Sequence, residues 1–514
     1  MLGMLRAGRN LIRMSRIAWI LARHDALFPL EMVGLAPLAL LAWPVRRRSM
    51  APQRPGERLA TALHALGPSF IKLGQALSTR ADVVGEEIAS DLSALRDRLP
   101  PFPGGEARVT IARELGAPIE ELYREFDDTP VAAASIAQVH YAVTAEGAEV
   151  AVKVLRPGIA RAFASDLDLF RWLSALIERT QPSLRRLKPV AVVETFAESV
   201  RLEMDLRFEA AAASELRENL RDDPDFRVPV VDWRRTSHQV LTLERVTGIP
   251  IDERERLVAA GHDPRAILEK AAQAFFKQVF RDGFFHADLH PGNLFVAADG
   301  AIAAVDFGIM GRVDRKTRFY LADMLMGFLS GDYRGVAEVH FAAGYVPRRH
   351  SVDAFTQACR SIGEPILGRP LQEISLARLL AQLFQVTEQF DMETQPQLLL
   401  LQKTMLVAEG VGRRLDPDVN MWTLARPLVE QWVRENRGPE ARLVDLAADV
   451  AAGLERLPTL LRDLETVAAS FAEERRQRGV NHATPGAARP GRAALSLPLW
   501  LAALALLAIA AALW

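Results

Sequence analysis

Two short segments in the second half of the chain carry side chains suited to phosphoryl transfer. The first holds Asp288 and, five residues later, Asn293, and the second is Asp306-Phe307-Gly308. Phosphoryl transfer requires a carboxylate close to the attacking group and oxygen ligands for a divalent metal ion. The order and spacing predict that Asp288 orients the attacking group, while Asn293 and Asp306 hold Mg²⁺. Each segment alone is more typical of a turn or a helix cap, so the prediction depends on the whole set.

A lysine inside an apolar strand adds to this set. Lys153 lies in the run 150–155, where a lysine is costly to bury unless it has a partner. In protein kinases such a lysine meets the nucleotide phosphates and is held by a glutamate from a helix. Glu203 and Glu209 are the candidates, and because they are six positions apart they should serve different partners. A solvated helix face is the alternative interpretation of this segment, and it suits Arg207 better than the two glutamates, given Lys153.

The segment expected at the phosphates is rich in alanine, whereas kinases have glycines there. Alanine enters the region of positive φ far less easily than glycine, so this loop should hold the phosphates in a different way. The residues of the loop that we assign to ATP are Pro130, Val131, Ala132, Ala133, Ala134, Ser135, Ile136, Ala137 and Gln138.

Two further departures concern the substrate side of the site. Ala287 stands where kinases have an arginine that reads phosphorylation of the activation loop, and no Ala-Pro-Glu motif follows Asp306. We therefore expect neither a phosphorylation switch of that kind nor the usual docking platform for peptides.

The elements that must position these side chains change character along the chain. Strand-like runs at 150–155 and 239–246 come early, and a largely helical region continues to about residue 478. This order predicts an α+β, atypical protein-kinase-like bilobal fold, with a helical extension before it. The predicted domains are 1–50 near a membrane, 51–105 as the helical extension, 106–247 and 248–440 as the two lobes, 441–492 as a tail and linker, and 493–514 as a transmembrane helix.

Both ends of the chain favour contact with a membrane. Residues 493–514 carry no charged side chain, and a helix of that length rises about 33 Å, enough to cross the hydrocarbon core. Arg489 and Arg492 precede it, which favours a cytoplasmic body anchored in the bacterial inner membrane. Near the N-terminus, arginines at helical spacing beside apolar residues favour a helix on an anionic membrane surface. A helix docked on the protein's own body is the alternative.

Composition excludes some classes of function. The 514 residues have a formal net charge of −1, which argues against nucleic acid as a partner, because such binding usually needs a basic excess. Hydrophobic residues make up 49% of the chain, enough to bury a core in most of it. Cys359 is the single cysteine, so no intramolecular disulfide can form and a reducing compartment is expected.

As a set, the motifs resemble those of the UbiB family of atypical kinases, which is tied to ubiquinone biosynthesis. The resemblance covers residues from about 51 to 437. It rests on Lys72-Leu73-Gly74-Gln75, the alanine-rich segment 132–140, Glu203-x-Asp205 with Glu209, the segment 285–293, Asp306-Phe307-Gly308 and the run 395–403.

The resemblance implies roles that spacing alone does not give. Residues 51–105 would fold over the active site and block protein substrates. Lys72 would meet the carboxylates of Glu203 and Asp205, which leaves Glu209 for Lys153. Glu244, at the end of the strand 239–246, is assigned to ATP together with Lys153 and Glu209. The regulatory residues would be Lys72, Gly74, Gln75, Glu203 and Asp205.

The resemblance also implies an activity and partners. We expect a membrane-associated kinase or ATPase that uses ATP and Mg²⁺ and that favours ATP hydrolysis near lipids over peptide phosphorylation. The expected partners are membrane lipids, prenylated quinone precursors, enzymes of ubiquinone biosynthesis and a second copy of the chain in a homodimer. A small-molecule kinase and a nucleotide-binding scaffold without catalysis are the alternatives.

Overall fold

The computed structural model describes most of the chain between residues 2 and 437. The described residues are 2–28, 54–78, 84–93, 95, 99–181, 188–365, 386–387, 389–392, 396–417 and 421–437. The chain divides into two compact units, 1–434 and 435–514, and nearly all described residues belong to the first. The predicted tail, linker and transmembrane helix at 441–514 lie outside the described residues. No helix among the described residues is both long and apolar enough to cross a bilayer.

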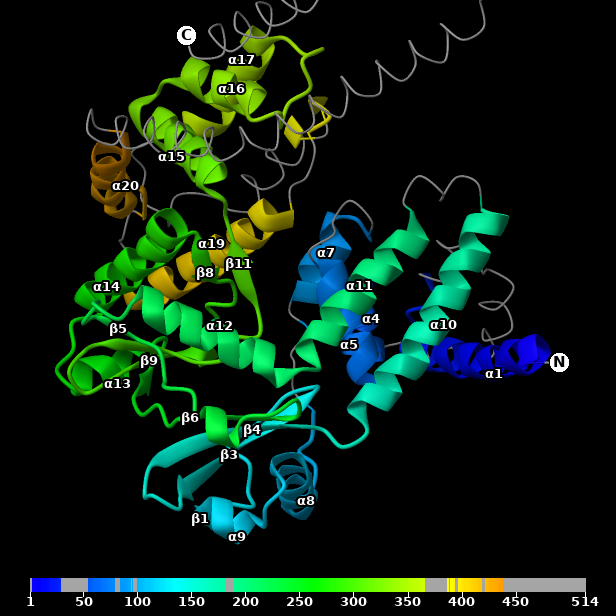
Figure 1. The fold of residues 1–514 in the computed structure, drawn as a ribbon. Coiled ribbons are helices and arrows are strands. Elements are labelled where there is room, and N and C mark those ends of the chain that lie inside the picture. Colours follow the sequence, from blue (N-terminus) through cyan, green and yellow to red (C-terminus); the bar gives the residue numbers. More distant parts are fainter. Residues whose placement is uncertain are drawn as a thin grey trace, which may run out of the picture. The chain divides into compact units, whose positions relative to one another are not determined.

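A five-stranded antiparallel sheet forms the smaller lobe (Figure 1). Its strands are β1 (Tyr123–Phe126), β2 (Ala132–Ala133), β3 (Ala137–Thr144), β4 (Glu149–Leu155) and β6 (Val240–Glu244), in the order β1-β3-β4-β6 with β2 beside β3. Val150, Val152 and Val154 of β4 are buried in one cluster with residues of α8 (Gly104–Leu115). Because side chains alternate along a strand, Lys153 points to the opposite face of the sheet.

Three helices connect β4 to β6. They are α10 (Ile159–Thr180), α11 (Pro189–Glu203) and α12 (Leu206–Asn219). The break between α11 and α12 follows from Asp205, whose carboxylate accepts the backbone N–H of Arg207 and caps α12. The backbone N–H of Leu206 donates to the carbonyl of His238 at 3.0 Å, which fixes the start of α12 beside the chain leading into β6.

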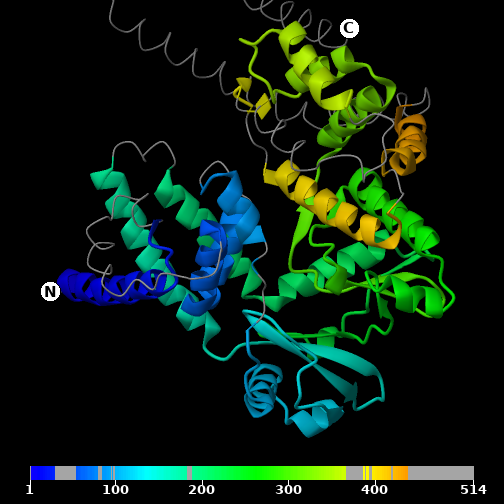
Figure 2. The same ribbon diagram turned by 180° about the vertical axis from the view of Figure 1, so that it is seen from behind.

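The predicted helical extension is present as a group of three helices, α4 (Pro55–Leu66), α5 (Pro68–Ser78) and α7 (Glu86–Ser93). Figures 1 and 2 show this group beside α10 and α11. The ring of Phe70 meets that of Phe170 edge-on at 5.3 Å, and Phe170 in turn lies 6.3 Å from Phe196. The extension therefore shares one hydrophobic core with the helices that carry the site.

The first helix, α1 (Leu2–Arg23), has one face docked on the body of the protein. Met14, Ala18 and Leu21 are buried, and Arg13 donates to the carbonyl of Ser165 at 2.7 Å and pairs with Asp166 on α10. The alternative that we left open, docking on the protein's own body, thus describes this face. The preferred prediction of a membrane-surface helix stays a prediction, and it concerns the opposite, exposed face of α1.

The larger lobe combines short strands with helices. Its small sheets have the orders β5-β10-β9-β7 and β11-β8. The strands are β5 (Phe226–Arg227), β7 (Ile249–Pro250), β8 (Phe284–His286), β9 (Leu294–Val296), β10 (Ile302–Ala304) and β11 (Met310–Arg312). The helices are α13 (Arg254–Ala259), α14 (Pro264–Phe276), α15 (Arg315–Ser330), α16 (Tyr333–Ala342), α17 (Val352–Gly363), α19 (Pro396–Leu415) and α20 (Met421–Arg437), with a π-helical turn at Lys277–Asp282. The predicted order of mixed and helical lobes is confirmed.

Candidate active site

A buried ion pair joins the sheet of the smaller lobe to α12. The ammonium of Lys153 on β4 lies 2.8 and 3.0 Å from the two carboxylate oxygens of Glu209. Burial raises the pKa of Glu209 to about 7, although the charge of Lys153 opposes this. Farther along α12, Glu215 pairs with Arg312 of β11 at 2.5 Å. Glu209, rather than Glu203, is therefore the glutamate that holds the strand lysine.

Asp306 meets the same ammonium from the larger lobe. Its Oδ1 lies 2.9 Å from Nζ of Lys153, and its backbone adopts φ +63°, a conformation uncommon outside glycine. The charge of Lys153 lowers the pKa of Asp306, and Lys72 of α5 adds to this. Phe307 is buried directly behind it, so packing fixes the unusual turn. A lysine, a glutamate and an aspartate from three distant segments thus converge.

The catalytic loop is organised by hydrogen bonds around Asp288. Nδ2 of Asn293 donates to the carbonyl of Asp288 at 3.0 Å and to its Oδ2 at 3.3 Å. The backbone N–H of Asp288 donates to Nδ1 of His286, whose Nε2 lies 3.2 Å from the carbonyl of Val305. Nδ1 therefore accepts and Nε2–H donates, which fixes the tautomer of a fully buried imidazole. Burial lowers the pKa of His286, so the neutral ring is favoured.

The hairpin of β9 and β10 brings the two predicted metal ligands together. Ala304 is paired with Leu294, and the N–H of Val305 donates to the carbonyl of Asn293 at 2.9 Å. Asp306 is the next residue, so the register places it beside Asn293. Thirteen positions of sequence separate two side chains that the strand pairing makes neighbours.

The donor set fits Mg²⁺. The amide nitrogen of Asn293 is directed at Asp288, which leaves its Oδ1 as an acceptor. Asp306 contributes carboxylate oxygens and is half exposed, so these oxygens are accessible. Mg²⁺ prefers oxygen ligands and usually binds one or two protein side chains together with phosphates and water.

The alanine-rich loop forms a tight turn at the start of β3. Ala132 and Ala133 pair with β3, and the N–H of Ala134 donates to the carbonyl of Ala137 at 2.8 Å. Val131 is exposed at its outer end, and Pro130 before it is partly buried. Inside the turn, the remaining residues are all buried, and they are Ser135, Ile136, Ala137 and Gln138.

Gln138 has a role that its assignment to ATP did not anticipate. Its side chain forms both possible bonds with the backbone of Phe102, at 3.0 Å from the N–H and 3.1 Å to the carbonyl. The amide of Gln138 therefore holds the segment before α8. Glu244, also assigned to ATP, ends β6, and its Oε2 accepts the N–H of Val230 at 3.2 Å.

Two of the predicted regulatory residues meet directly. Nζ of Lys72 lies 2.8 Å from Oε2 of Glu203, which joins α5 of the extension to the end of α11. Asp205, expected in the same cluster, instead binds the guanidinium of Arg207 at 2.9 and 2.7 Å. Hydrogen bonds from Arg207 lower the pKa of Asp205.

Gly74 and Gln75 lie on α5 close to Lys72. A Cβ on Gly74 would meet Leu63 of α4 at 2.7 Å and Leu95 at 3.3 Å, so the glycine allows three segments to approach closely. Gln75 is half buried on the same helix.

Sequence reasoning missed three residues that organise the site. His286 was part of the predicted loop, but only the structure reveals its bond to Asp288. Arg156 binds the alanine-rich loop, and its position just after β4 gave no signal. The hydroxyl of Thr404 on α19 lies 3.1 Å from the carbonyl of Ala287. It also lies 2.8 Å from the carbonyl of Leu400 on its own helix. It thus touches the catalytic loop from a helix more than a hundred residues away.

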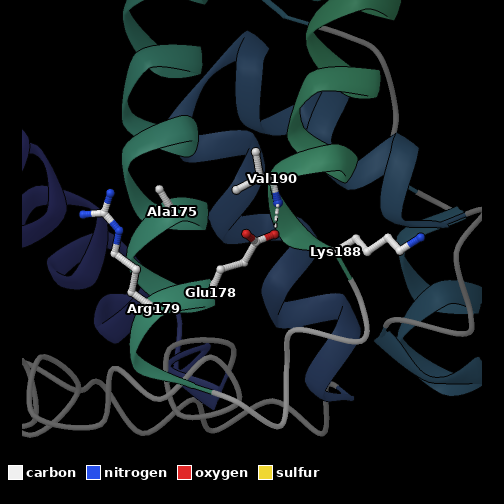
Figure 3. Close-up of a pocket in the computed structure, with 5 residues that line it drawn as sticks. All are labelled: Ala175, Glu178, Arg179, Lys188 and Val190. Carbon is white, nitrogen blue, oxygen red and sulfur yellow. Dashed lines mark hydrogen bonds between the residues drawn. The ribbon is translucent and has the colours of Figure 1, made fainter. Parts of the chain in front are cut away.

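A surface pocket lies elsewhere, between one end of α10 and the start of α11 (Figure 3). It has a volume of about 550 Å³ and is lined by Ala175, Glu178, Arg179, Lys188 and Val190. Glu178 accepts the backbone N–H of Val190 at 3.1 Å, which caps α11. None of the converging site residues lines this pocket.

Comparison with known proteins agrees with this geometry. The model of the ABC1 atypical kinase-like domain matches residues 94–340, and that of the UbiB helical domain matches residues 359–420. A protein of Marinobacter nauticus named "Probable protein kinase UbiB" is 43% identical over 88% of this chain and 84% of its own length. The chain belongs to the UbiB family. The predicted membership is confirmed, and with it a kinase-like fold.

Other UbiB relatives are similar over even more of the chain. The protein of the same name from Xylella fastidiosa is 40% identical over 92% of this chain and 87% of its own length. That from Azotobacter vinelandii is 41% identical over 90% and 86%. A solved structure of Rv3197 with erythromycin, from Mycobacterium tuberculosis, aligns with a TM-score of 0.49 and 28% identity, covering 72% of this chain and 94% of that one.

Proposed function

We propose that the protein is a membrane-associated, Mg²⁺-dependent ATPase or kinase-like enzyme that supports ubiquinone biosynthesis. The observation that carries the proposal is the convergence of Lys153, Glu209 and Asp306 beside the Asp288–Asn293 loop. Such a set combines a cation for phosphates, oxygen ligands for a metal ion and a carboxylate for the acceptor. The link to ubiquinone rests on membership of the UbiB family.

Each side chain has a distinct task in this proposal. Lys153, held by Glu209, binds the phosphates as a cation. Asn293 and Asp306 hold Mg²⁺, which supplies charge neutralisation at the transferred phosphoryl group. Asp288 orients the attacking hydroxyl or water. Because its Oδ2 accepts from the Asn293 amide, its other oxygen is the one directed at the acceptor's proton.

The extension favours water or a small acceptor over a peptide. Lys72 forms an ion pair with Glu203, and its charge contributes to the lowered pKa of Asp306. We infer that α5 lies near the carboxylate that would bind the metal. A peptide chain would need the same approach to Asp306. ATP hydrolysis, or transfer to a lipid-embedded precursor, is therefore the reaction we favour.

The outward face of α1 supports association with lipids. Ile12 and Trp19 are 73% and 44% exposed, and Arg16 and Arg23 share this face, with the guanidinium of Arg23 lying 4.9 Å from the Trp19 ring. Tryptophan and arginine on one exposed helix face are suited to an anionic bilayer surface. We place the body on the cytoplasmic side of the bacterial inner membrane, with prenylated precursors and biosynthetic enzymes as partners and a homodimer as the assembly.

The test is ATP turnover by the full-length protein with vesicles that contain anionic lipid. Asp306→Asn should lower turnover at least about a hundredfold, because the metal loses a charged ligand. Asp299→Asn, at the exposed turn of the same hairpin, should leave turnover unchanged. Full ATP turnover by Asp306→Asn would contradict the assignment of Asp306 as a metal ligand.

The biosynthetic role needs a second measurement. A deletion strain should regain ubiquinone with the wild-type gene and not with Asp306→Asn. Equal rescue by both would favour a nucleotide-binding scaffold over an enzyme.

A further inference from the structure

Arg156 holds the alanine-rich loop by its backbone and its side chain together. Its N–H donates to the carbonyl of Ile136 at 2.8 Å. Its guanidinium donates to the carbonyl of Ala134 from Nη2 at 2.8 Å and from Nε at 3.1 Å. Two carbonyls of one tight turn are thus drawn toward a single residue.

The direction of those carbonyls matters for a loop that faces phosphates. Phosphate oxygens are bound by backbone N–H groups and repelled by carbonyl oxygens. A glycine-rich loop can turn its carbonyls away by adopting positive φ, but alanine does so only at a cost. Arg156 supplies an alternative, because its donors hold the carbonyls of Ala134 and Ile136 toward itself without requiring positive φ in the loop.

The same guanidinium also reaches the segment that links the extension to the sheet. Nη2 of Arg156 lies 2.9 Å from the carbonyl of Pro100 and 3.4 Å from that of Leu99. The guanidinium lies 5.7 Å from the centre of the Phe102 ring. Phe102 is itself bound by Gln138 of β3 through both of its backbone groups. The loop and the connecting segment 99–102 are therefore tied together.

The contact between Arg156 and residues 99–102 also connects the loop to the helical extension. Residues 99–102 lead from α7 of the extension to α8 of the smaller lobe. A movement of the extension that pulls on this segment also acts on Arg156, and through it on the turn at Ala134. Only a planar fork with several donors can serve the loop and the segment at once, and lysine lacks this geometry.

We propose that Arg156 is a positioning residue that sets the alanine-rich loop for nucleotide phosphates and couples this loop to the extension. The inference rests on the proposed function, because it assumes that ATP binds at this loop. It predicts an effect specific to phosphates, which distinguishes it from a general loss of structure.

The experiment compares nucleotide affinities of the full-length protein with anionic vesicles. Arg156→Gln should weaken binding of ATP with Mg²⁺ about tenfold or more, and binding of adenosine less than about threefold. Arg156→Lys should weaken ATP binding similarly, because the charge remains and the fork is lost. Arg171→Gln, which breaks an exposed pair with Glu194, is the matched control and should change neither affinity.

Hydrogen exchange tests the coupling. ATP should slow exchange within α5 of the wild-type protein, and Arg156→Gln should abolish this slowing even at saturating ATP. Unchanged ATP affinity in Arg156→Gln, equal weakening for ATP and adenosine, unchanged ATP affinity in Arg156→Lys, or preserved slowing in α5 would each overturn the inference. If the wild-type protein bound no ATP, the proposed function itself would fail, which is a separate result.

Discussion

The two sides of the active site are built in different ways. On the side of the larger lobe, Asp288, Asn293 and Asp306 stand on a loop and a hairpin that hydrogen bonds of the side chains and the backbone hold together. On the other side, the loop that we assign to the phosphates is rich in alanine, and α5 of the extension is joined to α11 by the Lys72–Glu203 pair. The first side keeps the arrangement of protein kinases, and the second departs from it.

We infer from this difference that one side of the site carries out phosphoryl transfer and the other side controls which acceptors reach it. The catalytic loop holds what any phosphoryl transfer requires, whatever the acceptor. In the proposed function, the alanine-rich loop and the extension, which the Lys72–Glu203 pair joins to α11, control which acceptors reach it. Kinase-like chemistry can thus be retained while its substrates change, provided that the changes are confined to the side of the loop and the extension.

The largest expected effect tests the catalytic side. Asp288→Asn should lower kcat for ATP turnover by about 100- to 10,000-fold, the usual contribution of a positioned acid or base. The Kd for ATP should remain within about twofold, because Asp288 faces the acceptor and not the nucleotide. Steady-state turnover and nucleotide titration measure the two quantities. Asp222→Asn, at an exposed surface position, is the control, and an undiminished kcat in Asp288→Asn would contradict the comparison.

A second prediction concerns the packing of the extension. Gly74→Leu should lower the free energy of unfolding by about 1–3 kcal/mol, because the new side chain would collide with Leu63 and Leu95. The same substitution at Gly410 is the matched control, since that glycine is exposed on α19 with open space around it. Gly410→Leu should be neutral or slightly stabilising. Thermal unfolding of both variants decides, and equal melting temperatures would refute the close approach at Gly74.

The smallest expected effect is a pH dependence from His286. Burial lowers its pKa in the folded state below 6.5, so the unfolded chain binds the proton more readily. Its contribution to stability is therefore complete above pH 6.5 and is lost as the pH falls. His286→Asn keeps an acceptor for the Asp288 N–H and removes the titration. Urea unfolding at several pH values should show that the free energy of unfolding falls less steeply toward acid pH in this variant than in the wild type. An identical pH dependence in both proteins would contradict the prediction.

Much of the site could be predicted because its residues form short, local motifs. The strands at 150–155 and 239–246 were predicted close to their observed bounds, since short apolar runs are visible in sequence. The order of mixed and helical lobes followed from these elements. That these residues bind ATP stays a prediction.

Other features depend on contacts that sequence does not reveal. β3 was not predicted because it buries the polar residues Gln138 and His140, which are satisfied by the backbones of Phe102 and Asp127. The docking of α1 depends on Arg13 and a carboxylate more than 150 positions away. Such partners become neighbours only through the fold, so local patterns cannot indicate them.

The pairs along α12 have a consequence for how the site can be observed. This single helix holds Lys153 of the smaller lobe through Glu209 and Arg312 of the larger lobe through Glu215. A tilt of the helix would change both separations together, because one rigid rod carries both carboxylates. The separation of the exposed Glu215–Arg312 pair therefore reports on the buried Lys153–Glu209 pair. It can be measured with probes on the protein surface, without a label inside the cleft.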